Sequence, residues 1–297
     1  MASSKTAVDT NSAHNQLQSP LFGKLPAEIR NEIFELALQE YEDPERPYEK
    51  DTYYTRPGFT GRKRIDVALM QTCKLAYAEA RMVPFKSLEL SFYLGNSSRV
   101  PGEYRRNGPP RRGAGSDCHE ALGNEHLSME QWSAIKHVHI FPQLYAFNGA
   151  SIASRFGNRK DFKPSVVTIT IRYADWWYWE NNRKLELMNL RTHTITWPDS
   201  VEKIVMEFET REGKRKELEH IIKEIMDDPA GWQYSRENTG PLCIDRDEGV
   251  KEWNWDGPTT FGGTTSYPHH GDKDSMAYVV KALTWKPAPV EEDDDDN

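Results

Sequence analysis

The sequence of 297 residues has few cysteines and no long apolar stretch. Its three cysteines, Cys73, Cys118 and Cys243, lie far apart, which argues against a disulfide framework and a Cys-x-x-Cys metal pair. No run approaches the ~18 to 20 apolar residues of a membrane-spanning helix, so we expect no membrane partner. The first twenty residues lack the apolar centre of a secretory signal peptide. We therefore expect a protein of the cytoplasm or the nucleus.

The sequence also lacks an excess of basic charge. It has 38 Lys and Arg against 46 Asp and Glu, and residues 291–296 supply six of the acidic groups, so the net charge of −8 falls to −2 without them. Proteins that bind nucleic acids usually carry a basic face that releases several counterions. We therefore expect no nucleic-acid partner.

Familiar catalytic and cofactor motifs are absent as well. The chain has no GxSxG, GxxxxGK[ST] or GxGxxG pattern. His137 and His139 share one side of an expected strand, but no second close pair completes the three or four ligands that zinc needs. We expect no metal, no cofactor and no enzymatic activity.

Aromatic residues are plentiful, with nine Trp, thirteen Tyr and eleven Phe in a chain of mean hydropathy −0.78. Such rings bury ~150 to 250 Å² each, so they are expected to supply much of the core. The densest group lies at 175–180 and includes Asp175, Trp176, Trp177 and Trp179. Two interpretations stay open for these four residues. They form a partner or ligand surface, or the rings alternate into the core.

Composition divides the chain into five parts. Residues 1–19 and 287–297 are polar or acidic and are expected to be disordered tails. Between them we expect a helical module at 20–95 with an inserted loop at 41–64, a basic Pro/Gly/Arg linker at 96–126, and an aromatic-rich α/β region at 127–286.

Hydrophobic periodicity predicts two helices and a strand in the module. After Pro26, the residues Ile29, Ile33, Leu36 and Ala37 have the spacing of one buried helix face. A second helix is predicted over 69–83, ended by Pro84, and residues 88–94 alternate as in a half-buried strand.

Strand patterns dominate the second region. They are predicted at 136–141, 167–173, 193–197, 201–209 and 278–285, with one strongly amphipathic helix at 218–226. This succession favours an α+β fold with an irregular α/β region, and a degenerate leucine-rich-like stack stays open as a variant of it.

Two segments of the module, LFGKLPAEIRNEIF at 21–34 and LMQTCKLAYAEA at 69–80, match the patterns LxxLPxEIRxxIF and LLxTCRxxYxEA. With these 26 residues the chain resembles the F-box, specifically the divergent F-box-like proteins of filamentous fungi. Residues 168–180 and 205–210 are also similar to the C-terminal region of such proteins. The chain departs from the compact F-box pattern through the insert at 41–64.

The resemblance implies a small helical domain that docks on a Skp-type adaptor of a cullin-RING ubiquitin ligase, while a second domain holds an unknown protein substrate. The residues that match the adaptor-binding positions are Leu25, Pro26, Ile29, Ile33, Leu69 and Leu75. We thus expect a non-catalytic interaction protein. The alternative is a ligand-binding protein that uses residues 175–180 and in which the F-box-like helices are purely structural.

Overall fold

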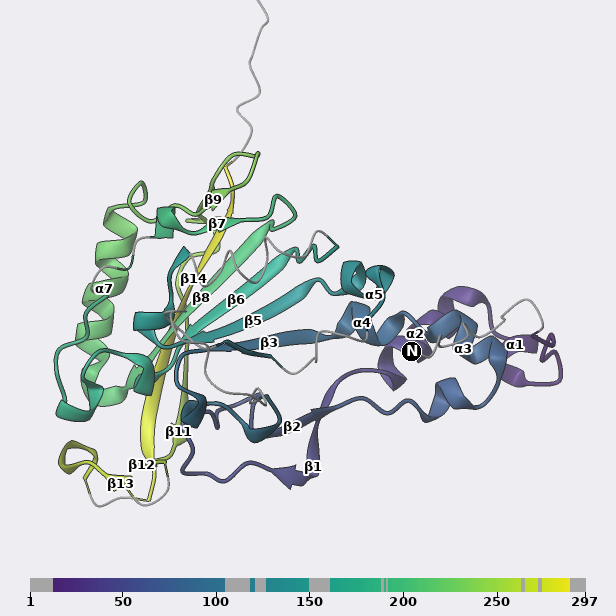
Figure 1. Cartoon of the computed structure of the whole chain (residues 1–297), viewed down its shortest axis with the longest axis horizontal. Coiled ribbons are helices and arrows are strands. Elements are labelled where there is room, and N and C mark those ends of the chain that lie inside the picture. Colours follow the sequence, from purple (N-terminus) through teal and green to yellow (C-terminus); the bar gives the residue numbers. More distant parts are fainter. Residues whose placement is uncertain are drawn as a thin grey trace, which may run out of the picture. The chain divides into compact units, whose positions relative to one another are not determined.

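The computed structural model in Figure 1 describes residues 13–104, 118–120, 127–149, 161–187, 190, 192–262, 265–271 and 274–288. The chain forms two compact units. Unit 1 extends to Pro47 and resumes at Gly61–Leu88, whereas unit 2 comprises Tyr48–Thr60 and the chain from Glu89 onward. The chain therefore passes between the units three times. We call Tyr48–Thr60 the strap, because it belongs to unit 2 while both of its sequence neighbours belong to unit 1.

Where the structure describes it, unit 1 contains four short helices, a strand pair and a 3-10 turn. They are α1 (Pro20–Gly23), α2 (Ala27–Ala37), β1 (Tyr41–Pro47), β2 (Gly61–Arg64), η2 (Ala68–Gln71), α3 (Lys74–Ala80) and α4 (Val83–Ser87). The prediction of an inserted loop at 41–64 is wrong in part, because β1 and β2, which precede and follow the strap in sequence, form an antiparallel pair. Since only Asp43 and Gly61 of this ribbon are buried, no apolar alternation marks it in the sequence.

The core of unit 1 forms around Phe34 of α2 and Leu38, the residue that caps the end of α2, which pack on Ala76 and Ala80 of α3. The predicted buried face of α2 is therefore wrong. Ile29 and Leu36 are 40% and 75% exposed, Ala37 is exposed and Ile33 is half-buried. The two alanines, one helical turn apart, leave space for Phe34 and Leu38, which have the same spacing.

The single helix predicted over 69–83 is instead η2, α3 and α4 in succession. Cys73 has extended backbone angles and caps α3, its Sγ accepting a hydrogen bond from the Ala76 N–H at 3.4 Å. Pro84 lies in the first turn of α4, where its missing N–H has no helical partner to lose, so it does not end a helix.

Unit 2 is built on an eight-stranded mixed sheet in the order β10-β14-β8-β6-β5-β3-β4, with β11 also paired to β14. The strands are β3 (Glu89–Leu94), β4 (Cys118–Glu120), β5 (His137–Pro142), β6 (Val166–Ile171), β8 (Lys203–Arg211), β10 (Leu242–Ile244), β11 (Lys251–Gly257) and β14 (Met276–Pro287). β3, β5, β6 and β8 run parallel, whereas the other pairings are antiparallel.

In its described residues, unit 2 also contains two helices and several short elements. The helices are α5 (Met129–Ala134) and α7 (Arg215–Asp227), and the small strand pairs are β7 (Thr196–Trp197) with β9 (Ser235–Arg236) and β12 (Thr260–Phe261) with β13 (Thr265–Ser266). The 3-10 turns are η3 (Ser97–Arg99), η4 (Gly102–Tyr104), η5 (Leu144–Ala146), η6 (Tyr173–Asp175), η7 (Trp179–Asn181), η8 (Thr192–Thr194), η9 (Glu212–Lys214) and η10 (Pro268–His270). None of the helices in the described residues is long and apolar enough to cross a membrane.

The α+β class is confirmed, and the boundaries differ in two places. β3 belongs to unit 2 rather than to the module at 20–95, and it is buried at every position from Leu90 to Leu94, so both of its faces are covered rather than one. The start of the expected linker is packed, since Val100 and Tyr104 join a buried cluster with Tyr93. Most of the remaining linker, and most of both expected tails, lies outside the described residues.

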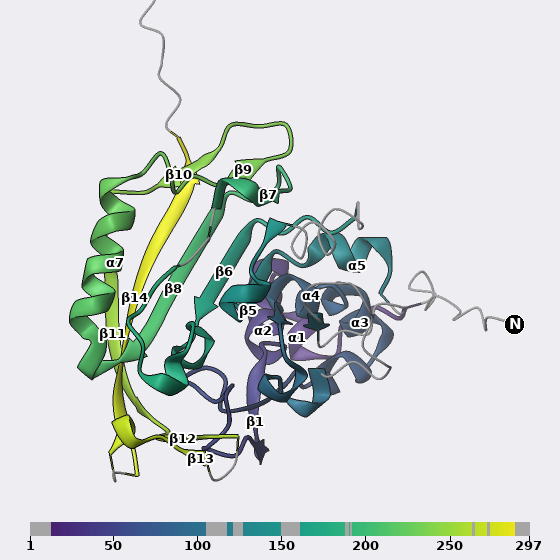
Figure 2. The same ribbon diagram turned by 60° about the vertical axis from the view of Figure 1, so that its left-hand side comes forward.

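The strand register gives the sheet one apolar and one polar face, because successive side chains of a strand point to opposite sides. The apolar face carries Leu90, Phe92, Val138, Ile140, Val167, Ile169, Ile204, Met206 and Phe208. Helix α7 packs on β8 and β14 (Figure 2). Its Glu219 pairs with Lys281, which lies opposite Phe208 in the register, so α7 covers the apolar face. The polar face carries Glu89, His139, Thr170, Arg172, Glu207 and Glu209.

Candidate functional site

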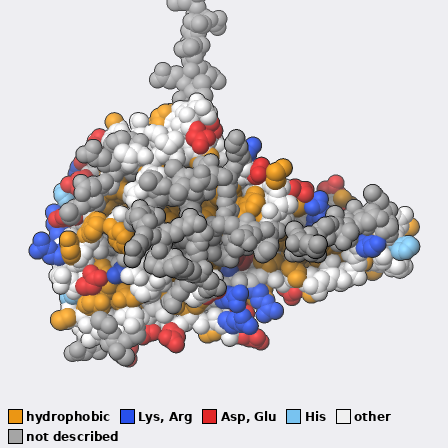
Figure 3. Space-filling view, in the orientation of Figure 1, with side chains coloured by type: hydrophobic (Ala, Val, Ile, Leu, Met, Phe, Trp, Pro, Cys, Tyr) orange, Lys and Arg blue, Asp and Glu red, His pale blue; other side chains and the backbone are white. Residues whose placement is uncertain are grey.

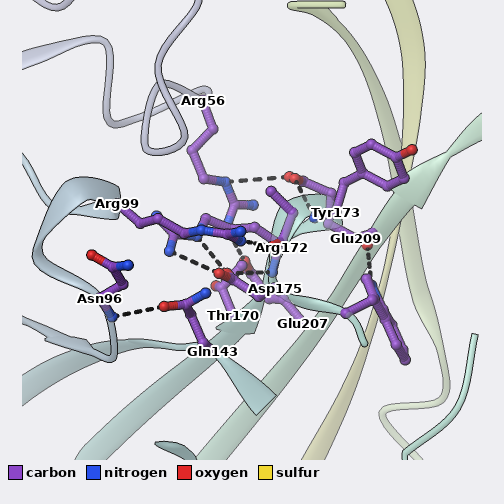
Figure 4. Close-up of polar contacts among 12 residues, drawn as sticks. Arg56, Asn96, Arg99, Gln143, Thr170, Arg172, Tyr173, Asp175, Glu207 and Glu209 are labelled. Atoms are coloured by element: carbon purple, nitrogen blue, oxygen red, sulfur yellow. Dashed lines mark hydrogen bonds and ion pairs between the residues drawn. The ribbon is translucent and has the colours of Figure 1, made fainter. Parts of the chain in front are cut away.

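The carboxyl ends of the parallel strands bring polar side chains together at one edge of the sheet (Figure 4). Ligands of sheets with parallel strands usually bind at this edge. Gln143 follows β5, and its Oε1 accepts a hydrogen bond from the Asn96 N–H beyond β3 at 2.7 Å. Arg172 and Asp175 follow β6, and Glu209 lies near the end of β8. This edge is the candidate site.

A row of hydrogen-bonded side chains runs across the polar face toward this edge. His139 Nδ1 lies 3.1 Å from Glu89 Oε1, and its Nε2 lies 2.7 Å from Thr170 Oγ1. The Thr170 hydroxyl donates to Glu207 Oε2 at 2.6 Å. Carboxylate, imidazole and hydroxyl in this order resemble an activated nucleophile. Thr170, however, is fully buried, so in this arrangement no substrate reaches its hydroxyl.

The two carboxylates of β8 are held by donors from the sheet itself. Glu207 receives the Thr170 hydroxyl, and Glu209 accepts from the Tyr173 N–H at 3.3 Å and from Trp255 Nε1 at 3.2 Å. Burial raises the pKa of Glu209, and the charge of Arg56 and the Tyr173 N–H oppose this rise. The carboxylates of Glu207 and Glu209 are therefore held in position by donors other than Arg56, and they need a cation beside them.

That cation comes from the strap. Arg56 is 5% exposed; its Nη1 lies 3.0 Å from Glu207 Oε2 and its Nε lies 3.6 Å from Glu209 Oε2 (Figure 4). Neither N–H is aligned for a hydrogen bond, so the attraction is one of charge. Arg56 thus neutralises two carboxylates that lie more than 150 positions further along the chain.

A second buried guanidinium lies beside the first. Arg172 contacts both oxygens of Asp175, with Nε–Oδ2 and Nη2–Oδ1 distances of 2.6 and 3.1 Å. Burial opposes the charge of Arg172, but the neighbouring carboxylate of Asp175 outweighs it and raises the pKa of Arg172. The guanidinium also lies over the rings of Phe141 and Tyr93, at 5.4 and 5.8 Å.

A small hollow of about 260 Å³, including its open mouth, lies among these groups. It is lined by Tyr53, Thr55, Arg56, Arg172, Tyr173, Ala174, Glu209, Trp255, Pro258, Phe261 and Tyr278. Its interior has space for about one water molecule. The side chain of Arg56 and its neighbours therefore fill the site.

Tyr173 connects this site to a pair of histidines. Its hydroxyl lies 3.0 Å from His269 Nε2 and 2.9 Å from His270 Nε2. His270 Nδ1 lies 2.5 Å from the Thr259 carbonyl, so it carries the proton, and Nε2 accepts from Tyr173. The same hydroxyl then accepts from His269. Burial and the neighbouring His270 lower the pKa of His269 to about 4, which agrees with a neutral ring.

The aromatic segment 175–180 does not form the surface considered for it. Asp175, Trp176 and Trp179 are only 3 to 4% exposed, and Trp177 is half-buried. Trp176 Nε1 donates to the Glu209 carbonyl at 2.8 Å, and the carboxylate of Asp175 forms an ion pair with Arg172. The turn η6 directs these rings into the core of unit 2. Tyr178, at 58% exposed and with a φ of 52°, is the outward-facing member.

The residues matched to adaptor binding all belong to unit 1 and differ in exposure. Pro26 and Ile29 are exposed, whereas Leu25, Ile33, Leu69 and Leu75 are half-buried. Leu69 contacts the core of the unit. Figure 3 shows hydrophobic side chains among charged ones on the visible face of the described residues.

Sequence reasoning missed Arg56, Glu207 and Glu209. A signal for the two glutamates was present, because Thr168, Thr170 and Arg172, like Glu207 and Glu209, are polar at every second position of otherwise apolar strands. Such alternation predicts a polar sheet face. Arg56 carried no signal of this kind, because its partners lie in a distant part of the sequence.

No protein-family model, curated protein or solved structure matches this chain. In the part of the chain that the structure describes, no group of three or more His, Cys, Asp or Glu side chains is placed to hold a metal ion.

Proposed function

We propose that the chain is a non-catalytic substrate receptor of the F-box type. In this proposal unit 1 docks on a Skp-type adaptor of a cullin-RING ubiquitin ligase, and unit 2 holds the protein substrate. The receptor would raise the local concentration of substrate at the ligase without bond chemistry of its own. The observation that carries the proposal is the exposed apolar face of α2, in the segment that resembles the F-box.

Helix α2 has apolar side chains on two sides. Phe34 and the following Leu38 supply the core of unit 1, yet Ile29 and Leu36 remain 40% and 75% exposed. Moving such a side chain fully from water into an apolar contact is worth about 1.5 to 3 kcal/mol. Scaled by these exposed fractions, a partner that covered both would gain roughly 2 to 3 kcal/mol without disturbing the core.

The start of α2 is held in place before any partner arrives. Arg30 Nη1 donates to the Leu25 carbonyl at 2.9 Å, and its guanidinium lies over the Phe22 ring at 5.6 Å. Such preorganisation lowers the ordering cost of association. It supports docking through the Leu25 to Ile33 stretch rather than through a segment that must first fold.

Co-purification of the full chain with a purified Skp-type adaptor tests the proposal. We expect binding by the wild type and its loss in the variants Ile29→Asp and Leu36→Asp. The matched control is Val250→Asp, which adds the same charge at a residue of unit 2 that is 42% exposed, and which should bind normally. Absence of binding by the intact, folded wild type would refute adaptor docking.

A further inference from the structure

We infer that Glu207 and Glu209 form a recognition site for an arginine presented on a tight turn, and that the strap occupies this site in the free protein. The ligand is a polypeptide in which an aromatic residue follows the arginine three positions later. That this polypeptide is the substrate of a ligase rests on the proposed function. The existence of the arginine site does not depend on that function.

The carboxylates are arranged independently of their occupant. Thr170, the Tyr173 N–H and Trp255 Nε1 orient them from within the sheet. Two carboxylates held close together and largely buried repel each other and require a cation. A guanidinium spreads its charge over three nitrogens, so Nη1 and Nε of Arg56 each lie beside a different carboxylate, whereas the ammonium of lysine is a compact charge.

The strap presents its arginine on a β-turn. The Phe59 N–H donates to the Arg56 carbonyl at 2.8 Å across Pro57 and Gly58, and Gly58 has a φ of 79°. Proline followed by a glycine with positive φ is typical of a type II turn. Arg56 and Phe59 are buried, whereas Pro57 and Gly58 are exposed. The turn therefore points its first and last side chains into the sheet.

Phe59 fills an aromatic subsite beside the carboxylates. Its ring packs edge-on against His139 at 5.0 Å and against Phe141 at 4.8 Å, in a cluster with Tyr93. Aromatic pairs of this geometry add stabilisation beyond that of their buried area. The site thus distinguishes two features of its ligand, a guanidinium and a ring at the fourth position of the turn.

The strap lies on the site as a ligand would. Among the described residues it joins no strand of the sheet, and the strand-like pairing found for it there is the local bridge between Arg56 and Phe59. Its ends meet where the Tyr48 N–H donates to the Thr60 carbonyl at 2.8 Å. A separate chain that carries the same turn would make these contacts in place of the strap.

A labelled peptide of residues 52–60, titrated against the full chain, tests this inference by fluorescence anisotropy. We expect the variant Arg56→Ala to bind it at least tenfold more tightly than the wild type, because the tethered strap competes at an effective concentration on the order of millimolar. Peptides carrying Arg56→Ala or Phe59→Ala should bind this variant at least tenfold more weakly. The control Arg64→Ala, at a 57% exposed arginine of unit 1, should match the wild type.

The variant Arg56→Lys serves the same purpose if Arg56→Ala does not fold, since it keeps the charge but concentrates it on one nitrogen that cannot lie beside both carboxylates as the guanidinium does. It should bind the peptide more tightly than the wild type. A folded variant that gains no affinity, or equal binding of the peptide without its arginine, would overturn the site. Because no adaptor is present in this assay, peptide binding without adaptor docking would refute the proposed function alone, and the reverse result would refute the site alone.

Discussion

Arg30 and Glu79 form a two-pronged ion pair between α2 and α3, with Nε–Oε2 and Nη2–Oε1 distances of 2.8 Å each. The two residues are 49 positions apart and lie in the two segments that carry the F-box resemblance. A planar guanidinium and a carboxylate in this geometry impose a defined orientation as well as attraction. The pair therefore couples the two matching segments within unit 1.

Replacement of either partner should lower the free energy of unfolding. We expect the variants Arg30→Ala and Glu79→Ala each to shift the urea midpoint downward, and the double variant to lose less than the sum of the two, because both remove the same interaction. The control Arg62→Ala, at an exposed arginine of β2, should leave the midpoint unchanged. Strictly additive losses would show that the pair contributes nothing of its own.

The two faces of α2 should respond very differently to truncation. Phe34→Ala removes a fully buried ring and should cost about 3 to 5 kcal/mol. Leu36→Ala, at a side chain that is 75% exposed, should change stability by less than about 0.5 kcal/mol. Chemical denaturation of both variants measures this difference. Similar costs for the two would mean that Leu36 is covered in solution.

Loss of the strap's cation should destabilise unit 2. Arg56→Ala leaves Glu207 and Glu209 without their buried counter-charge, and removal of one partner from a buried ion pair typically costs about 3 to 5 kcal/mol. Adding Glu207→Gln and Glu209→Gln to this variant should recover part of the loss. Urea titrations of the single and triple variants provide the measurement, and a further decrease in the triple variant would contradict this account.

A side chain at Gly58 should destabilise the turn of the strap. A Cβ added there meets no atom within 4 Å, so backbone strain at a φ of 79° is the whole effect, and Gly58→Ala should cost about 1 kcal/mol. Gly240 has equally open surroundings without a positive φ. Gly240→Ala should therefore be neutral or slightly stabilising, and an equal cost at both glycines would argue against the turn.

The pair His269 and His270 should make stability depend on pH in the mildly acidic range. The pKa of His269 is lowered to about 4 in the folded protein, so its contribution is present above the unfolded value of about 6.5 and is lost as pH falls toward 4. Between pH 7 and pH 5 we expect a loss of roughly 1 kcal/mol, allowing for partial exposure. His269→Asn should flatten this dependence in urea titrations, whereas His220→Asn, at an exposed histidine, should not.

The spacing of apolar residues correctly predicted the buried face of elements that are apolar on one side. In α7 the residues Leu218, Ile221, Ile222 and Ile225 are buried as the spacing predicts. For α2 the same reasoning chose the wrong side, because that helix is apolar on both sides. The choice between them depends on the small alanines of α3, which periodicity within α2 does not report.

The candidate site was harder to predict for a related reason. The density of rings at 175–180 drew attention to Trp176 and Trp179, and these rings fill the core. The groups that line the site come from β6, β8 and the strap, and no local pattern connects Arg56 with Glu207. Their association is a consequence of the sheet register and of the route of the chain.

The route of the chain also sets an order of events during translation. Arg56 and Phe59 leave the ribosome about 150 residues before Glu207 and Glu209, which at ~5 to 20 residues per second is a delay of roughly 8 to 30 s. Unit 1 up to Leu88 is complete early in this interval, apart from the strap that it carries. On the nascent chain Arg56 therefore lacks its carboxylate partners until β8 emerges, whereas the aromatic partners of Phe59 on β3 and β5 emerge earlier.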